Sequence, residues 1–141
     1  MSRIFWDSML FVYMLDDHPV YSARVLQLLA RAKDRGDSLH TSYLALGEIL
    51  AGAAKSPDPT KRQTVRTTLD KIGFSYMTFG EGAVAPFGRL RAQTGLKIAD
   101  AIHLACAASG GIDLFLTGDK QLVGLHVPGV QFIADFNNPI L

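Results

Sequence analysis

Short apolar segments alternate with helix-forming segments along this chain, and this alternation limits the possible folds more than any other feature. The segments that we expect to form strands are residues 3–6, 38–42, 74–79, 113–117 and 130–136. The segments that we expect to form helices are residues 19–36, 43–54, 59–73, 81–95 and 97–108. Strands separated by helices pair in parallel and are covered by helices on both faces. We therefore predict one α/β domain over residues 1–141, a three-layer α/β/α sandwich with a mostly parallel five-stranded sheet.

The first long helix illustrates the residue pattern. The segment 19–36 begins with proline and ends with glycine, an order that favours a helix between them. Its apolar face is expected to hold residues at helical spacing, namely Val20, Ala23, Leu26, Leu29 and Ala30.

Composition narrows the class of protein. The formal net charge is only +1, so any nucleic-acid binding must come from local rather than global positive charge. The single cysteine, Cys106, can form neither an intrachain disulfide nor a cysteine-based zinc site, which fits a reducing compartment. The sequence has no signal-peptide pattern and no apolar run of the roughly 18 residues that a membrane span needs. We expect a soluble, cytoplasmic protein.

Four acidic residues occupy positions that a parallel sheet would bring together. Asp7 follows the first strand directly, and Asp119 comes two residues after the fourth. Glu48 lies in the helix after the second strand, and Asp100 opens the helix that leads into the fourth. Right-handed crossovers place the carboxyl ends of all strands at one edge, where ligands bind at the point of reversed strand order. If the first and fourth strands are neighbours, the four carboxylates converge.

A cluster of unpaired carboxylates favours a divalent cation. Like charges at short range raise the pKa of one another, and Mg²⁺ or Mn²⁺ relieves the repulsion because hard cations prefer oxygen ligands. Such ions can activate water and stabilise the charge that develops on a phosphodiester.

Each acid also has a simpler interpretation. Asp7, Asp100 and Asp119 can cap the helices that follow them, and Glu48 can lie on a polar helix face. Capping does not explain Glu48, which lies inside the apolar segment "ALGEILAG". Burying an unpaired carboxylate there would be costly.

Four motifs resemble those of PIN-domain nucleases in order and spacing over essentially the whole chain. The segment "IFWDSMLFVYML" resembles the opening strand and first acidic motif of that family, and "SYLALGEIL" resembles the second. The third and fourth are similar to "LKIADAIHLACAA" and "LFLTGDKQL". The small size is most similar to the VapC-type toxins of bacterial toxin–antitoxin pairs.

This resemblance implies Mg²⁺- or Mn²⁺-dependent cleavage of RNA by an activated water. The residues that it implies to be both catalytic and metal-binding are Asp7, Glu48, Asp100 and Asp119. Ser8 and Thr117 match positions where the family often has a hydroxyl near the metal or phosphate. Many members have asparagine where this chain has Met9, which puts the polar support of the first aspartate in question.

The expected partners are an RNA substrate, a cognate antitoxin and a second copy of the chain. The apolar segment 9–15 is either core or half of a groove for an apolar partner helix, as antitoxins of this family bind. The basic residues that we expect nearest the acids are Arg89, Arg91, Lys97 and Lys120. Each is either an ordinary surface charge or a phosphate contact.

Other kinds of site are less consistent with the sequence. No Gly-x-Ser-x-Gly elbow or phosphate-binding loop is present. An aspartyl phosphatase would need an acid where Met9 stands, and Lys120 is poorly placed for a phospho-receiver domain. His103 shares a helix face with Asp100 but lacks the further nitrogen or sulfur ligands of a zinc site. Two alternatives stay open: a PIN-like binding module without activity, and another metal-dependent phosphoester hydrolase.

Overall fold

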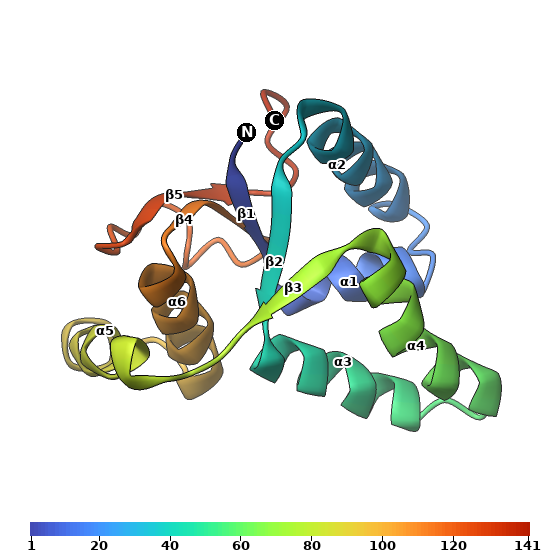
Figure 1. Cartoon of the computed structure of the whole chain (residues 1–141), viewed down its shortest axis with the longest axis horizontal. Coiled ribbons are helices and arrows are strands. Elements are labelled where there is room, and N and C mark those ends of the chain that lie inside the picture. The colour runs from blue at the N-terminus through green and yellow to red at the C-terminus, as the bar shows by residue number, and fades with distance from the viewer.

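The computed structural model describes all residues, 1–141, and its centre is a single sheet in the strand order β3-β2-β1-β4-β5 (Figure 1). The strands are β1 (Arg3–Trp6), β2 (Ser38–Ser42), β3 (Phe74–Met77), β4 (Ile112–Thr117) and β5 (Val130–Asp135). Every neighbouring pair is parallel. The predicted fold class is therefore confirmed, and so is the adjacency of the first and fourth expected strands, which are β1 and β4.

Six helices cover the two faces of this sheet (Figure 1). They are α1 (Ser8–Leu15), α2 (Ser22–Arg35), α3 (Tyr43–Ala54), α4 (Pro59–Ile72), α5 (Glu81–Gln93) and α6 (Ile98–Gly110). Strand β1 shows the two faces, because side chains alternate along a strand. Ile4 and Trp6 pack into the core beneath α1 to α4, whereas Phe5 packs into the core beneath α5 and α6. None of the helices combines the length and the apolar character needed to cross a membrane.

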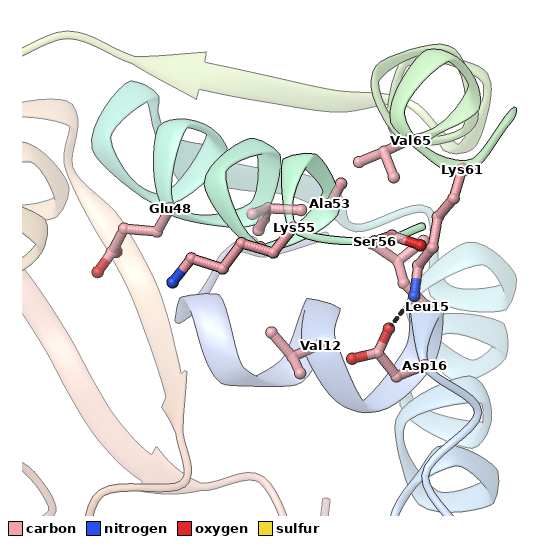
Figure 2. A pocket seen from close by; sticks show the side chains of 11 residues that line it. Val12, Leu15, Asp16, Glu48, Ala53, Lys55, Ser56, Lys61 and Val65 are labelled. Atoms are coloured by element: carbon pink, nitrogen blue, oxygen red, sulfur yellow. Dashed lines mark hydrogen bonds and ion pairs between the residues drawn. The ribbon is translucent and has the colours of Figure 1, made fainter. Parts of the chain in front are cut away.

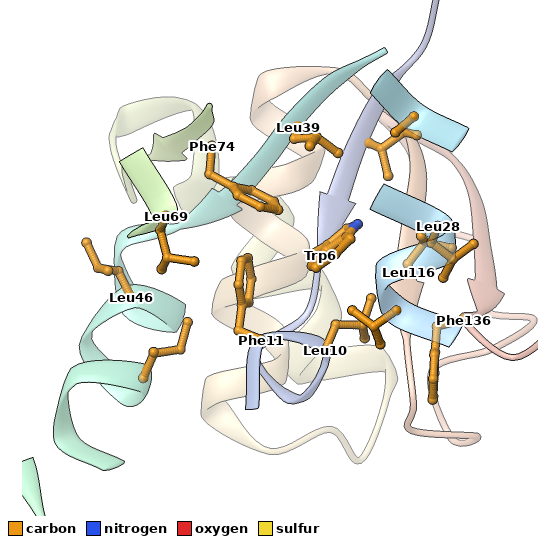
Figure 3. Packing of buried hydrophobic residues seen from close by; sticks show 14 of the residues in the cluster. Trp6, Leu10, Phe11, Leu28, Leu39, Leu46, Leu69, Phe74, Leu116 and Phe136 are labelled. Atoms are coloured by element: carbon orange, nitrogen blue, oxygen red, sulfur yellow. The ribbon is translucent and has the colours of Figure 1, made fainter. Parts of the chain in front are cut away.

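An aromatic cluster fills the larger core (Figure 3). The Trp6 ring lies 5.3 Å from the ring of Phe11 and 5.1 Å from that of Phe74, centroid to centroid. Phe11 and Phe74 meet edge to face at 4.7 Å. Three fully or nearly fully buried rings at these distances bury large apolar areas in favourable geometry. The cluster joins β1, α1 and β3, so it holds the start of α1 against the sheet.

The segment 9–15 forms most of α1, and it contributes both to the core and to a surface groove. Leu10 and Phe11 are buried in the core. Val12 and Leu15 are partly exposed and line a groove beside α3 and α4.

The apolar face predicted for the first long helix is largely wrong, because only Leu29 of the predicted set packs against the core. Helix α2 begins at Ser22 rather than Pro19, because the His18 ring nitrogen Nδ1 accepts the backbone N–H groups of Val20 and Tyr21 in a preceding turn. The buried residues are Val25, Leu28 and Ala32. Val20 is 68% exposed and Leu26 is 49% exposed. Both sets have helical spacing, so only packing against the sheet selects between them.

Truncating Phe11 tests the aromatic core. We expect Phe11→Ala to lower the free energy of unfolding by about 3–5 kcal/mol, because a fully buried ring leaves a cavity between β1 and β3. Denaturant unfolding followed by Trp6 fluorescence measures the change. The control is Phe132→Ala, since that ring is 65% exposed and should cost little. Equal losses of unfolding free energy in Phe11→Ala and Phe132→Ala would contradict the burial of Phe11 between Trp6 and Phe74.

Candidate active site at the carboxyl edge of the sheet

Asp7 is both a helix cap and a buried acid at the edge of the sheet. It follows β1 directly, is only 6% exposed and is the N-cap residue of α1. Its Oδ1 accepts the backbone N–H of Ser8 at 2.8 Å. Its Oδ2 accepts the hydroxyl of Thr117 at 2.8 Å. The capping interpretation is therefore correct for Asp7, and it is compatible with a role in the site, since each oxygen keeps further acceptor capacity.

Thr117 connects two of the predicted acids. It is the last residue of β4 and is fully buried. Its hydroxyl donates to Asp7 and accepts the backbone N–H of Asp119 at 3.0 Å. The Asp119 carboxylate accepts the N–H of Gln121 at 2.9 Å in a turn, not at the start of a helix. Asp119 thus caps no helix, and one hydroxyl fixes its backbone relative to Asp7.

Asp100 faces these two aspartates from the first turn of α6. The N-cap residue of that helix is Lys97, so Asp100 is not its cap. Burial raises the pKa of the Asp100 carboxyl above its ordinary value, and the charges of Asp7 and Asp119 raise it further, while His103 and Lys97 act in the opposite direction. The carboxylates of Asp7 and Asp119 act on Asp100 because all three residues lie at the carboxyl edge of the sheet, after β1, after β4 and in the first turn of α6.

Glu48 is held apart from the aspartates by a buried histidine. Its Oε1 lies 2.8 Å from Nε2 of His103, whose Nδ1 lies 2.7 Å from the hydroxyl oxygen of Ser42. That oxygen also accepts the backbone N–H of Ala45. The serine O–H is then free to donate to Nδ1, which assigns the proton of a neutral ring to Nε2 and directs it at Glu48.

Glu48 is not buried, contrary to the prediction from its apolar segment. The Glu48 side chain is 41% exposed, whereas His103 is buried. The exposed face of α3 lets the carboxylate reach solvent while its partner stays in the core. No three His, Cys, Asp or Glu side chains are arranged closely enough to hold a metal ion in this structure. Glu48 therefore joins the site only through His103, one turn along α6 from Asp100.

Ser42 is a site residue that the sequence analysis missed. It ends β2 and is the N-cap residue of α3, and it is fully buried. A serine directly before a helix is a recognisable capping signal, but its second partner, His103, is 61 residues away in sequence. Sequence spacing alone does not indicate that contact.

Ser8 and Thr117, the two hydroxyl residues predicted near the acids, contact Asp7 in different ways. Thr117 contacts Asp7 as described, whereas Ser8 contributes its backbone N–H to that carboxylate and its hydroxyl makes no hydrogen bond within the chain. Met9, at the family's usual asparagine position, is 43% exposed. Thr117 therefore supplies part of the polar support for Asp7 that Met9 cannot.

The predicted basic residues do not gather at the acids. Arg91 donates to the backbone carbonyl of Leu96, and Arg89 lines a separate cavity beside α5. Lys97 precedes α6 and lowers the pKa of Asp100. Lys120 follows Asp119 and makes no ion pair. Only Lys97 and Lys120 adjoin the acidic site.

A groove of about 430 Å³ begins beside Glu48 and runs between α1, α3 and α4 (Figure 2). Lys61 and Asp16 form an ion pair at its far end. The residues that line it are Val12, Leu15, Asp16, Glu48, Ile49, Gly52, Ala53, Lys55, Ser56, Lys61 and Val65. The groove thus has an apolar floor, charged rims and one predicted site residue at its entrance.

Comparison with known proteins identifies the family of the chain. The family model of the PIN domain matches residues 4–125. The chain belongs to the PIN domain family. No curated protein matches it significantly.

Solved structures share the PIN-domain fold over nearly the whole chain. A chain of VapBC2 from Rickettsia felis, bound to a promoter DNA fragment, is 21% identical over 94% of this chain and 97% of its own, with a TM-score of 0.67. A chain of DNA-bound VapBC from Salmonella typhimurium is 18% identical over 96% and 99%, with a TM-score of 0.73. A chain of VapBC-5 from Mycobacterium tuberculosis, of the VapBC family of toxin–antitoxin systems, is 19% identical over 96% and 99%, with a TM-score of 0.61.

Removing the Ser42 hydroxyl tests the buried hydrogen bonds. We expect Ser42→Ala to lower the free energy of unfolding by about 2 kcal/mol, because it removes the α3 cap and leaves Nδ1 of His103 without a partner. Chemical denaturation measures the loss. Ser75→Ala is the control, since Ser75 is exposed on β3 and its hydroxyl makes no hydrogen bond. A Ser42→Ala protein as stable as this control would show that the contacts contribute nothing.

Proposed function

We propose that this PIN domain is a Mg²⁺- or Mn²⁺-dependent ribonuclease that hydrolyses RNA phosphodiester bonds, and that it is the toxin of a toxin–antitoxin pair. The observation that carries the proposal is the grouping of three aspartates, from the ends of β1 and β4 and the start of α6. The ends of β1 and β4 flank the switch point of strand order, where parallel sheets bind ligands, and this supports the proposal.

The donor set suits a hard divalent cation. Asp7, Asp100 and Asp119 offer only carboxylate oxygens, and their repulsion would be relieved by a bound Mg²⁺ or Mn²⁺. We infer that these three would hold the ion, with Glu48 as the fourth acid and Ser8 close by. Because no three acidic side chains stand close enough to hold a metal in this structure, binding would require the side chains to move together. When bound, the ion would lower the pKa of a water and stabilise charge on the phosphate.

The chain's own residues orient the acids. Thr117 directs Asp7 by donating to Oδ2, and it sets the backbone of Asp119 by accepting its N–H. His103 fixes one oxygen of Glu48 and leaves the other without a hydrogen bond within the chain. Such fixed carboxylates are preorganised, which is the main way in which a site favours a charged transition state.

An RNA cleavage assay tests the proposed activity. We expect the purified protein to cleave a mixed single-stranded RNA pool with Mg²⁺ or Mn²⁺ and to lose cleavage in EDTA. Asp100→Asn should slow cleavage by about 100-fold or more, because it removes one of the carboxylates proposed to hold the metal ion. The control is Asp34→Asn, an exposed α2 residue without hydrogen bonds.

Each alternative predicts a different result. Binding of RNA with no cleavage under any metal condition would favour a module whose acids are inactive. Hydrolysis of phosphomonoesters in preference to RNA would favour another metal-dependent phosphoester hydrolase. Cleavage that survives both EDTA and Asp100→Asn would refute the assignment of these acids.

The groove beside Glu48 is the proposed antitoxin site. Its floor of Val12, Ile49 and Val65 suits the apolar face of a partner helix, and Lys55, which has no ion-pair partner, suits an acidic residue on its flank. The structural neighbours are VapBC complexes, which supports an antitoxin partner of this kind. An occupant of the groove would also contact Glu48.

Two glycines of α3 test this groove as a matched pair. Gly52 lines the groove and Gly47 does not, and an added Cβ at either position meets nothing within 4 Å. We expect Gly52→Leu to fill the groove and weaken binding of the antitoxin encoded by the adjacent gene by about 100-fold, since a helix can no longer seat there. Gly47→Leu should bind normally. Titration calorimetry measures both.

The two variants should fold alike, because each replaces a helical glycine by a good helix former. Equal affinities for the antitoxin would place its site elsewhere on the domain. The expected homodimer and cytoplasmic location stay predictions, and sedimentation of the purified chain checks the first.

A further inference from the structure

A second cavity of about 410 Å³ is lined by Gly118 and Lys120, the two neighbours of Asp119 in the chain. It is also lined by Tyr13 of α1, by Tyr21 before α2, and by Asp135 and Phe136 at the end of β5. In the sheet order β1-β4-β5, this cavity lies one strand beyond the aspartates. Its volume is in the range of roughly 300–1,000 Å³ that is typical of small-molecule sites.

Aromatic rings form one wall of this cavity. The Tyr13 ring lies 5.0 Å from that of Tyr21 and 5.5 Å from that of Phe136, centroid to centroid. Phe136 is buried, whereas both tyrosines are partly exposed and neither hydroxyl makes a hydrogen bond within the chain. Partly exposed rings supported by a buried one are a surface on which a planar ligand can stack.

The cavity and the acidic site share a wall. Gly118 stands between Thr117 and Asp119, and a Cβ added to it would meet the Phe136 ring at 3.4 Å and the Tyr13 hydroxyl at 3.9 Å. The N–H of Phe136 donates to the carbonyl of Thr117 at 3.0 Å. A ligand on the aromatic wall is therefore held next to the segment that carries Asp119.

Arg24 of α2 fixes the segment after β5 that lines the cavity. Its guanidinium donates to the carbonyl oxygen of Phe136 at 3.1 Å and to that of Asn138 at 2.5 Å. These bonds tie the segment after β5 to α2. The cavity is thus largely preformed, which lowers the entropy cost of binding.

The cavity contains one positive and one negative side chain, Lys120 and Asp135. Such a pair suits a ligand that has an anionic group and a planar group with hydrogen-bond donors. Lys120 has no ion-pair partner. The Asp135 carboxylate accepts one N–H from Asn137 through Oδ1, and its other oxygen has no partner within the chain. Burial raises the pKa of the Tyr13 phenol, with smaller contributions from Tyr21 and Asp135, so this ring stays neutral.

We propose that this cavity binds one unpaired nucleotide of the RNA next to the bond that is cleaved, with the base on the Tyr13 and Tyr21 rings and its phosphate at Lys120. The proposal rests on the proposed ribonuclease function. Stacking on tyrosine is possible for every base, and the free oxygen of Asp135 accepts hydrogen bonds from bases with an amino group.

Binding to a cleavage-deficient protein tests the cavity without relying on activity. The probe is a fluorescein-labelled single-stranded hexanucleotide of mixed sequence, measured by anisotropy against the Asp100→Asn chain in EDTA. On this background we expect Tyr21→Leu to raise Kd about tenfold, because base stacking is lost. Lys120→Ala should raise Kd several-fold and reduce the slope of log Kd against log salt by about 0.7, the value for one phosphate contact.

Three variants serve as controls. Tyr21→Phe keeps the ring and should bind like the parent. Phe132→Leu removes an exposed ring outside the cavity, and Lys71→Ala removes an exposed charge at the end of α4. A free 5′-mononucleotide should compete far more weakly than the hexanucleotide, and equal competition would overturn the assignment to RNA.

The outcomes separate this proposal from the ribonuclease itself. If the wild-type chain cleaves RNA but Tyr21→Leu and Lys120→Ala bind like their controls, the nuclease stands and the subsite is refuted. If both variants bind weakly as expected and no metal-dependent cleavage is found, the subsite stands without the nuclease. Absence of hexanucleotide binding by the parent at low salt would overturn the subsite directly.

Discussion

The hydrogen bond between the Thr117 hydroxyl and the Asp7 carboxylate is the contact on which the arrangement of the site depends. It joins the residues that end β4 and follow β1, which are separated by 110 positions in sequence. It forms because the two strands pair in parallel, with Trp6 opposite Leu116. The direction in which strands are added to the sheet reverses between β1 and β4. The segments that follow these two strands therefore run to opposite sides and leave the carboxyl ends of β1 and β4 accessible. Had the fourth strand added beyond β3, the aspartates would lie at opposite ends of the sheet.

The same polar residues hold the fold and form the site. Asp7 caps α1 while it faces Asp100, and Ser42 caps α3 while it contacts His103. Helix α6 combines the two roles along its length, because its buried face packs on the sheet and its first turn carries Asp100. Three acidic side chains near one another oppose folding through repulsion, and these caps offset part of that cost. Stability and the charge of the site are therefore coupled.

Three features lie next to one another along the carboxyl edge of the sheet. A groove with apolar floor lies beside Glu48, the aspartates lie at the ends of β1 and β4, and an aromatic cavity lies at the end of β5. Glu48 borders the first feature and Gly118 borders the last. This order follows from the strand order alone, because each helix or loop after a strand stands above the strand that it leaves.

The sequence by itself determined the fold class, because strand and helix periods are local constraints. It left the adjacency of β1 and β4 as a condition for the grouping of the acids, and only the tertiary structure places these two strands side by side. The sequence did not determine which face of α2 is buried or that Glu48 is exposed and paired with His103. Those features depend on packing between segments distant in sequence, where several apolar sets have equally good helical spacing. Tertiary structure alone decided them, because burial selects one face only once the neighbouring helix and sheet are in place.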